Sequence, residues 1–199
     1  MKTEIEVKFC DIDTAKIRAE LAAAGGVCEV PMRLMRRVLI EEPHHEADHS
    51  FLRVRDEGDK VTLTFKRRGR PDDPTIDSVQ ELEVTVSDFE DTVAILREAG
   101  WSHKTYQETK RETWKLGEVE VVIDEWPWLP PYIEIEGDNE AAVRAAAETL
   151  GFDWADAQFG HIDAVYARLY DFAEGFRGVI DLAEVRFTLP RPKQFIARN

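Results

Sequence analysis

Cysteine is scarce in this 199-residue chain, and long apolar runs are missing from it. The two cysteines, Cys10 and Cys28, have a spacing that matches neither a metal motif nor a redox pair. No stretch approaches the roughly 18 consecutive apolar residues of a membrane span. The first residues also lack the apolar segment of a signal peptide. We therefore expect a cytoplasmic protein with reduced, inert thiols and no membrane association.

Positive charge is in deficit as well. The chain has 40 Asp and Glu against 26 Lys and Arg, a formal net charge of −14. Such a balance argues against nonspecific binding of nucleic acid, which needs a basic surface. A small anion held in a locally basic cleft is still compatible with it. The hydrophobic fraction of 43% is ordinary for a globular protein, and the length predicts one domain.

Alternating patterns predict about eight strands. Residues 4–9 place Ile5, Val7 and Phe9 on one face and charged side chains on the other. The same period recurs in residues 51–55, 61–65, 81–86, 119–124 and 133–136, and less regular strands are expected at 35–40 and 111–116. Short polar turns separate most of them, so the strands are expected to pair in an antiparallel sheet.

Four amphipathic helices are predicted at 13–24, 87–100, 139–150 and 162–169. The second of these opens on a capping box that starts at Ser87. The helices are expected to cover the apolar strand faces, and residues 41–50 and 68–78 are expected to be loops. We expect one domain over residues 1–175, with residues 176–199 as a partly irregular extension of it.

Charged side chains occupy the polar faces of the strands in an unusual mixture of signs. If the sheet closes on itself, these residues line a tunnel. Burying carboxylates and guanidinium groups together is costly and gives no packing advantage, so the lining must hold a ligand. Carboxylates bind divalent cations, and Arg and Lys bind phosphate oxygens. The pattern therefore favours a site for a metal-bound polyphosphate.

The order of these residues resembles the signature of a known superfamily. Glu4-Ile5-Glu6-Val7-Lys8 is similar to the ExExK motif of the CYTH superfamily, the triphosphate tunnel metalloenzymes. The remaining matches follow in order as Leu52-Arg53-Val54-Arg55, Lys66, Glu81 with Glu83, Lys110-Arg111, Ile123-Asp124-Glu125 and Glu134-Ile135-Glu136. The resemblance covers residues 1–170. It implies an α+β fold, in which an eight-stranded antiparallel closed β-barrel forms a tunnel and helices pack on its outside.

The resemblance also implies a role for each matching residue. The expected metal ligands, for two Mg²⁺ or Mn²⁺ ions, are Glu4, Glu6, Asp124, Glu134 and Glu136. The expected substrate-binding residues are Lys8, Arg53, Arg55, Lys66, Glu81 and Arg111. The expected catalytic residues are Glu4, Glu6, Lys8, Lys66 and Glu83.

The implied reaction is hydrolysis of a triphosphate, whether inorganic triphosphate, ATP or thiamine triphosphate. An adenylate cyclase of class IV, which makes cyclic AMP and pyrophosphate from ATP, is the alternative. A noncatalytic module that binds nucleotides or polyphosphate is the lesser alternative. The oligomeric state stays open, a homodimer included.

Three features allow two interpretations each. Trp126, Trp128 and Tyr132 form either an aromatic rim for a base or, as we favour, part of the packed core around a proline turn. The histidines His44, His45 and His49 have no metal-binding spacing, so a surface loop is favoured over a zinc site. In the second strand, either Arg36 or Arg37 faces the tunnel.

Overall fold

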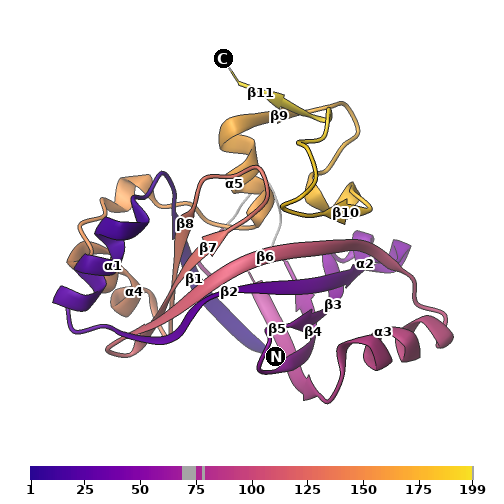
Figure 1. Ribbon diagram of the computed structural model, residues 1–199, viewed down its shortest axis with the longest axis horizontal. Coiled ribbons are helices and arrows are strands. Elements are labelled where there is room, and N and C mark those ends of the chain that lie inside the picture. Colours follow the sequence, from indigo (N-terminus) through magenta and orange to yellow (C-terminus); the bar gives the residue numbers. More distant parts are fainter. Residues whose placement is uncertain (69–74, 78, 199) are drawn as a thin grey trace.

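Eight antiparallel strands close into a barrel in the computed structural model, which describes residues 1–68, 75–77 and 79–198 (Figure 1). These strands are β1 (Lys2–Phe9), β2 (Val27–Ile40), β3 (Ser50–Asp56), β4 (Val61–Arg67), β5 (Val79–Val86), β6 (His103–Leu116), β7 (Val119–Glu125) and β8 (Tyr132–Gly137). They pair in the order β6-β2-β3-β4-β5-β1-β8-β7, and β7 pairs again with β6. The predicted fold class is confirmed. Most of the predicted loop at 68–78 lies outside the described residues.

Two strands are far longer than the sequence pattern indicates. Both β2 and β6 have 14 residues, and they pair along their whole length. Register shifts interrupt β2, two of them in the half that carries Pro31, so its alternation is broken. The first part of β6 is polar on both faces, which leaves no apolar alternation to detect.

Three helices lie close to their predicted positions, as α1 (Thr14–Ala23), α3 (Phe89–Glu98) and α4 (Glu140–Thr149). The side chains of Asp13, Asp88 and Asn139 accept hydrogen bonds from the first-turn N–H groups. The cap of α3 is therefore Asp88, one residue later than the predicted Ser87. Among the described residues, no helix has both the length and the apolar character needed to cross a membrane.

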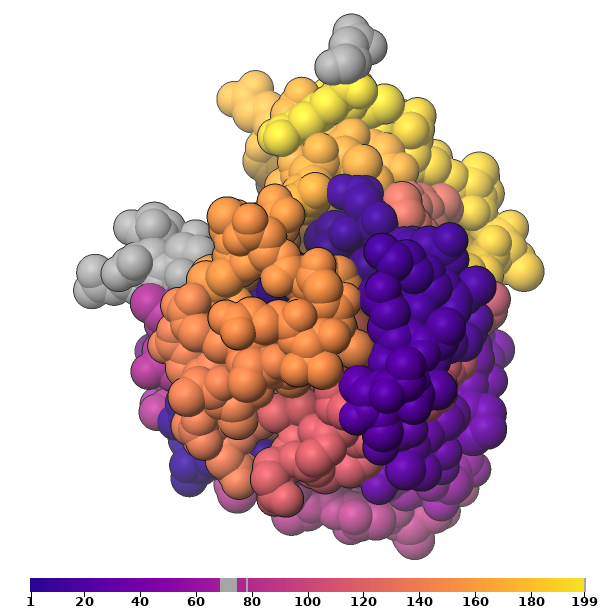
Figure 2. Space-filling view, turned by 90° about the vertical axis from the view of Figure 1, so that its left-hand side faces the viewer, coloured from indigo at the N-terminus to yellow at the C-terminus, as the bar shows by residue number. Residues whose placement is uncertain are grey.

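The main apolar core lies outside the barrel wall. Helices α1 and α4 lie side by side on one face of the molecule (Figure 2). They pack on the outward side chains of β1, β7 and β8, of which Val7, Val121 and Ile135 are completely buried. The same strands direct their charged side chains inward, so this core fixes the position of the tunnel lining.

Helical cover of the barrel is incomplete. Helix α3 places Phe89 against Val38 and Val54 on the outer face of β2 and β3. On β5, however, Leu82 and Val84 are 60% and 52% exposed. The helices thus cover two parts of the wall and leave the outer face of β5 open.

The predicted loop at 41–50 contains a short helix, α2 (Pro43–Ala47). His45 in this helix is buried and stacks on Trp101, with ring centroids 5.2 Å apart. Within the described part of the chain, no three His, Cys, Asp or Glu side chains are grouped to hold a metal ion. His45 therefore serves the packing of this segment.

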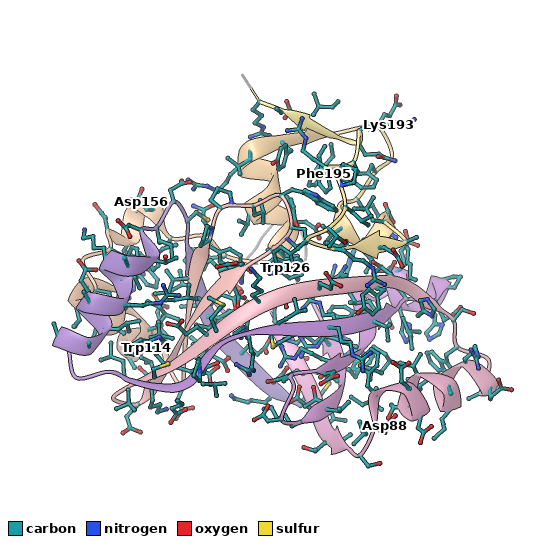
Figure 3. All side chains as sticks on the ribbon, viewed as in Figure 1. Asp88, Trp114, Trp126, Asp156, Lys193 and Phe195 are labelled. Carbon is teal, nitrogen blue, oxygen red and sulfur yellow. The ribbon has the colours of Figure 1, made fainter. Side chains whose placement is uncertain are left out.

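The C-terminal residues 160–198, here called the cap, fold over one end of the barrel (Figure 1). The preceding turn is η1 (Trp154–Asp156), and the cap contains α5 (Ile162–Leu169), β9 (Tyr170–Phe172), η2 (Val179–Asp181), β10 (Glu184–Val185) and β11 (Phe195–Ala197). Strand β10 pairs with β6, and β11 pairs with β9. The core of the cap includes Phe195 and joins the barrel at Trp126 (Figure 3).

Candidate functional site

The barrel encloses a cavity of about 310 Å³, and side chains from all eight strands line it. All twelve charged residues predicted from the sequence line this cavity, namely Glu4, Glu6, Lys8, Arg53, Arg55, Lys66, Glu81, Glu83, Arg111, Asp124, Glu134 and Glu136. The pleat of each strand explains this placement, because residues two apart point to the same side. Their individual roles stay predictions.

Lys66 joins two of the carboxylates. Its Nζ donates to Glu4 at 2.7 and 2.8 Å and lies 3.3 Å from a carboxylate oxygen of Glu81. Burial alone would raise the pKa of Glu81, but the charge of Lys66, together with hydrogen bonds to Glu81 and the charge of Arg53, lowers it. Lys66 therefore links two carboxylates from different strands through a single ammonium group.

A second charged cluster centres on Glu134. Lys8 donates to Glu6 at 2.7 Å and lies 3.3 Å from Glu134, while Arg111 donates to Glu134 at 2.8 Å and to both oxygens of Asp124. Burial opposes the ionised form of Glu134, yet Lys8 and Arg111 prevail and lower its pKa to about 2. Lys8 also donates to the carbonyl oxygen of Gly160 at 2.9 Å, which ties the cluster to the cap.

Arg53 is a cavity arginine that lacks a close anionic partner among the described residues. Arg53 is only 6% exposed, and its Nε is buried without a hydrogen-bond partner among the described residues. The distance from its guanidinium group to Glu83 is a long 3.5 Å. Burial and the neighbouring charge of Arg55 lower the pKa of Arg53 to about 10. An anionic ligand would relieve this unfavourable environment.

The structure resolves the choice between Arg36 and Arg37 in β2. Arg36 lies outside, where it pairs with Asp56 and Glu90. Arg37 lines the cavity, donates to the side chain of Gln107 at 2.9 Å, and lies 4.2 Å from the ring centroid of Trp126. Burial, followed by the charges of Arg53 and Arg55, lowers the pKa of Arg37 to about 9.

Carboxylates dominate the part of the cavity around Glu136. Glu136 lies opposite Glu6 in the β1–β8 ladder and opposite Glu120 in the β7–β8 ladder. Burial and the charges of Glu4 and Glu6 raise the pKa of Glu136, against the effect of Lys2. Oxygen donors under mutual repulsion suit a hard divalent cation such as Mg²⁺ or Mn²⁺. Glu4, Glu6 and Glu136 supply such oxygens, but among the described residues they are not grouped as a metal site, because Lys66, Lys8 and Lys2 contact them instead. A divalent ion would have to displace these lysines.

Several lining residues are absent from the sequence prediction. Arg68 continues the alternation of β4 beyond Lys66, so the strand pattern contains the signal for it. Gln107 lies four residues before Arg111 in β6, on the same face of the strand, so alternation contains the signal for it as well. His161 and Asp163 come from the cap, and no local pattern connects them with the barrel.

The aromatic segment after β7 divides between the cavity and the cap. Trp126 and Tyr132 line the cavity but are 4% and 1% exposed. Trp128 is directed to the cap, where its Nε1 donates to the carbonyl oxygen of Leu189. These positions agree with the favoured interpretation, in which the segment is part of the packed core.

A family model described as the CYTH domain matches residues 2–155. The chain belongs to the CYTH family. Comparison with curated proteins by sequence gave no match. The match ends before the cap, so the cap lies outside the CYTH domain as the model defines it.

Solved structures share the CYTH fold with this chain. A conserved hypothetical protein from Pyrococcus furiosus has a TM-score of 0.64 at 22% identity, covering 78% of this chain and 95% of its own. A "putative adenylate cyclase" from Vibrio parahaemolyticus has a TM-score of 0.68 at 12% identity, covering 83% and 98%. A "putative adenylyl cyclase" from Hippeastrum, described with a dominant triphosphatase activity, has a TM-score of 0.55 at 15% identity, covering 84% and 96%. At these identities the likeness shows the fold alone.

Proposed function

We propose that this CYTH protein is a divalent-metal-dependent enzyme that hydrolyses triphosphate substrates inside its barrel. The observation that carries the proposal is the environment of Arg53, a buried guanidinium group with an unpartnered Nε beside Arg37 and Arg55. Arginine binds phosphate oxygens through paired N–H groups, so a phosphate chain would supply the missing acceptors.

We assign the basic residues of the cavity to the phosphate chain and the acidic residues to the metal ion. Arg53, Arg55 and Arg111 would hold phosphate oxygens, and Lys8 and Lys66 would exchange a carboxylate for a phosphate as the substrate enters. Glu4, Glu6 and Glu136, with Asp124 and Glu134, would hold Mg²⁺ or Mn²⁺. The metal, when bound, would offset charge on the phosphate chain and lower the pKa of a water molecule.

Glu83 is suited to orient the attacking water. Thr64 donates a 2.7 Å hydrogen bond to one of its carboxylate oxygens. Burial would raise the pKa of Glu83, but this hydrogen bond and the charge of Arg53 lower it. The carboxylate is thus ionised at neutral pH and can accept a proton from water.

The packing of the aromatic residues near the cavity favours hydrolysis over cyclisation. Arg37 lies over the ring of Trp126, and Tyr166 meets that ring edge-on. The hydroxyl of Tyr132 donates to Asp124 at 3.3 Å. Trp126 and Tyr132 are also only 4% and 1% exposed, so neither ring offers a free face to an adenine base. The Hippeastrum structure supports the same order of preference, because that protein has a dominant triphosphatase activity.

The test is a product assay with the full chain. Inorganic triphosphate, ATP and thiamine triphosphate are each incubated with Mg²⁺ or Mn²⁺, and orthophosphate, pyrophosphate and cyclic AMP are measured. We expect orthophosphate as the product. Formation of cyclic AMP from ATP would instead show that the protein is an adenylate cyclase. Binding of a substrate without turnover of any of the three would show that the protein is a noncatalytic binding module.

A variant pair connects the assay to the proposed site. Arg53→Gln is expected to lower kcat/KM for triphosphate by about 100-fold or more, the scale of a lost charge-assisted contact to a buried anion. Arg97→Gln, on the exposed surface of α3, is the matched control and should retain wild-type activity. Equal activity in both variants would contradict the proposed clamp.

A further inference from the structure

The cap covers one end of the tunnel and adds its own residues to the lining. Residues 160–163 with Val179 and Ile180 face the cavity from this side. Lys8 and Gln107 donate to the carbonyl oxygens of Gly160 and Val179, at 2.9 and 3.4 Å. Ile180 also packs against the barrel. The opposite end of the tunnel is open to solvent, since Glu136 pairs there with Lys2, whose side chain is 62% exposed.

Two arginines at the capped end have no carboxylate within ion-pair distance among the described residues. Arg37 has only Gln107 and Trp126 as partners there. Arg68 lies 4.3 Å from the ring centroid of Phe51, and its buried Nε has no hydrogen-bond partner in the described part of the chain. Two incompletely partnered guanidinium groups at the capped end form a strong anion-binding environment.

The cap contributes Asp163 near this pair, but no ion pair joins Asp163 to either arginine among the described residues. The charges of Arg68 and Arg37 both act to lower the pKa of Asp163, but burial outweighs them and raises it. One oxygen of Asp163 accepts a hydrogen bond from the N–H of Val179 at 3.1 Å. Gly178 makes this approach possible, since its φ is 117° and a Cβ there would collide with the Asp163 carboxylate.

Helix α5 adds further positive potential. It begins at Ile162, in the lining of the cavity, and the side chain of His161 makes no capping hydrogen bond. The N-terminal N–H groups of a helix favour anions. Here they supplement the two arginines at the same end of the tunnel.

A second cavity of about 350 Å³ adjoins the first at Arg68, His161, Asp163 and Ile180. Its other lining includes Glu41 and Glu46, which already bind Arg177 at 2.8 and 2.9 Å. These carboxylates would repel a phosphate that moved past Arg68. Arg177 lines this second cavity too, but its charge is already paired with these carboxylates, so the unpaired positive charge of the tunnel ends at Arg68.

We infer that Arg37 and Arg68 form a terminal anion subsite at the capped end, which binds the unsubstituted last phosphate of the substrate. The inference rests on the proposed function and specifies it further. Substrates must then carry one free phosphate end, and any organic group lies toward the open mouth of the tunnel. Both inorganic triphosphate and nucleoside triphosphates meet this condition, whereas a triphosphate esterified at both ends does not.

The sequence supplies a matched control for each arginine. Arg36 and Arg67 directly precede Arg37 and Arg68, and neither lines the two cavities. Calorimetric titration with inorganic triphosphate in metal-stripped buffer would compare Arg37→Gln and Arg68→Gln with Arg36→Gln and Arg67→Gln. We expect the first two to raise Kd by about 10- to 100-fold, the range of a hydrogen bond to a charged group, and the controls to match wild type.

A second titration uses diadenosine triphosphate, which has no free phosphate end. Wild-type protein should bind it at least tenfold more weakly than inorganic triphosphate. Wild-type affinity in Arg37→Gln and Arg68→Gln, or equal affinity for the two ligands, would overturn the subsite but not the proposed function. Failure of the wild type to bind inorganic triphosphate, with or without Mg²⁺, would overturn both. If Arg37→Gln does not fold, Arg68→Gln decides the outcome.

Discussion

Residues two positions apart on one strand of this protein have opposite electrostatic environments. Glu134 in β8 is held by Lys8 and Arg111, and its pKa is lowered to about 2. Glu136 in the same strand experiences burial and the negative charges of Glu4 and Glu6, and its pKa is raised. A carboxylate with a lowered pKa stabilises the folded state at neutral pH, and one with a raised pKa destabilises it.

Neutralising these two residues should therefore change stability in opposite directions. Glu134→Gln is expected to lower the free energy of unfolding at pH 7 on the order of 3 kcal/mol, because it leaves Lys8 and Arg111 short of an anion. Glu136→Gln should raise it. Urea denaturation without divalent ions measures both changes. A loss of stability of similar size in both variants would show that the two carboxylates have the same structural role.

His161 in the cap contributes to the loss of folding stability at acidic pH. Burial, followed by the charges of Arg68 and Lys8, lowers the pKa of His161 from 6.5 to about 2. The unfolded chain therefore binds a proton below pH 6.5 that the folded chain does not, and stability falls as the pH decreases from 6.5.

His161→Gln should remove this contribution to the pH dependence of the unfolding free energy. Between pH 7 and pH 5, wild-type protein is expected to lose on the order of 2 kcal/mol more unfolding free energy than the variant. Urea denaturation at the two pH values measures the difference. His103→Gln, at an exposed position at the start of β6, is the control and should follow wild type. Identical pH dependence of His161→Gln and wild type would contradict the burial of His161 as a neutral group.

At the scale of single elements, sequence patterns located the helices but not every boundary. The motif from Ser87 to Glu90 predicts a cap at Ser87, whereas the side chain of Asp88 accepts from the N–H of Asp91 at 2.8 Å. Both residues are good helix caps, so composition alone does not distinguish them. The burial of Phe89 against the barrel decides the choice, because it fixes where the first turn must lie.

Two substitutions test this boundary. Asp88→Ala should lower the free energy of unfolding by about 1 kcal/mol, as expected for loss of a helix cap. Ser87→Ala should have an effect of less than about 0.5 kcal/mol, typical of an exposed site without a cap role. Thermal denaturation of both variants is the measurement. A larger loss in Ser87→Ala would place the cap where the sequence motif put it.

At the scale of the whole molecule, closing the sheet concentrates charge that separate strands would expose to water. Glu136 is far from Glu4 and Glu6 in the sequence and becomes their neighbour only in the folded state. A divalent ion that binds this set would therefore bind the folded chain and not the unfolded one, and would stabilise it.

Millimolar Mg²⁺ or Mn²⁺ should raise the melting temperature of the wild-type protein. At a concentration 100 times Kd the gain is about 2.7 kcal/mol, which corresponds to roughly 5–10 °C for a chain of this size. The double variant Glu6→Gln/Glu136→Gln should lose most of this shift. Glu118→Gln/Glu148→Gln, at two exposed positions, should keep it. Equal shifts in the two double variants would place the ion elsewhere.

The amino-acid sequence by itself determined the family, the barrel and the twelve charged residues of its interior. Alternation of period two is a local property, so Glu4, Glu6 and Lys8 were assigned to one face of β1 before any neighbour was known. The ordered motifs then predicted the CYTH fold, and the family match over residues 2–155 confirms it.

Only the tertiary structure decided the ends of the tunnel and the facing of β2. Register shifts break the alternation of β2, and the choice of Arg37 over Arg36 follows from pairing with β3 and β6 across the barrel. The cap brings His161 and Asp163 against Arg68 over a separation of more than 90 residues, through packing of its own core on Trp126. Contacts of that kind depend on complementary surfaces between distant elements, which no local sequence period encodes.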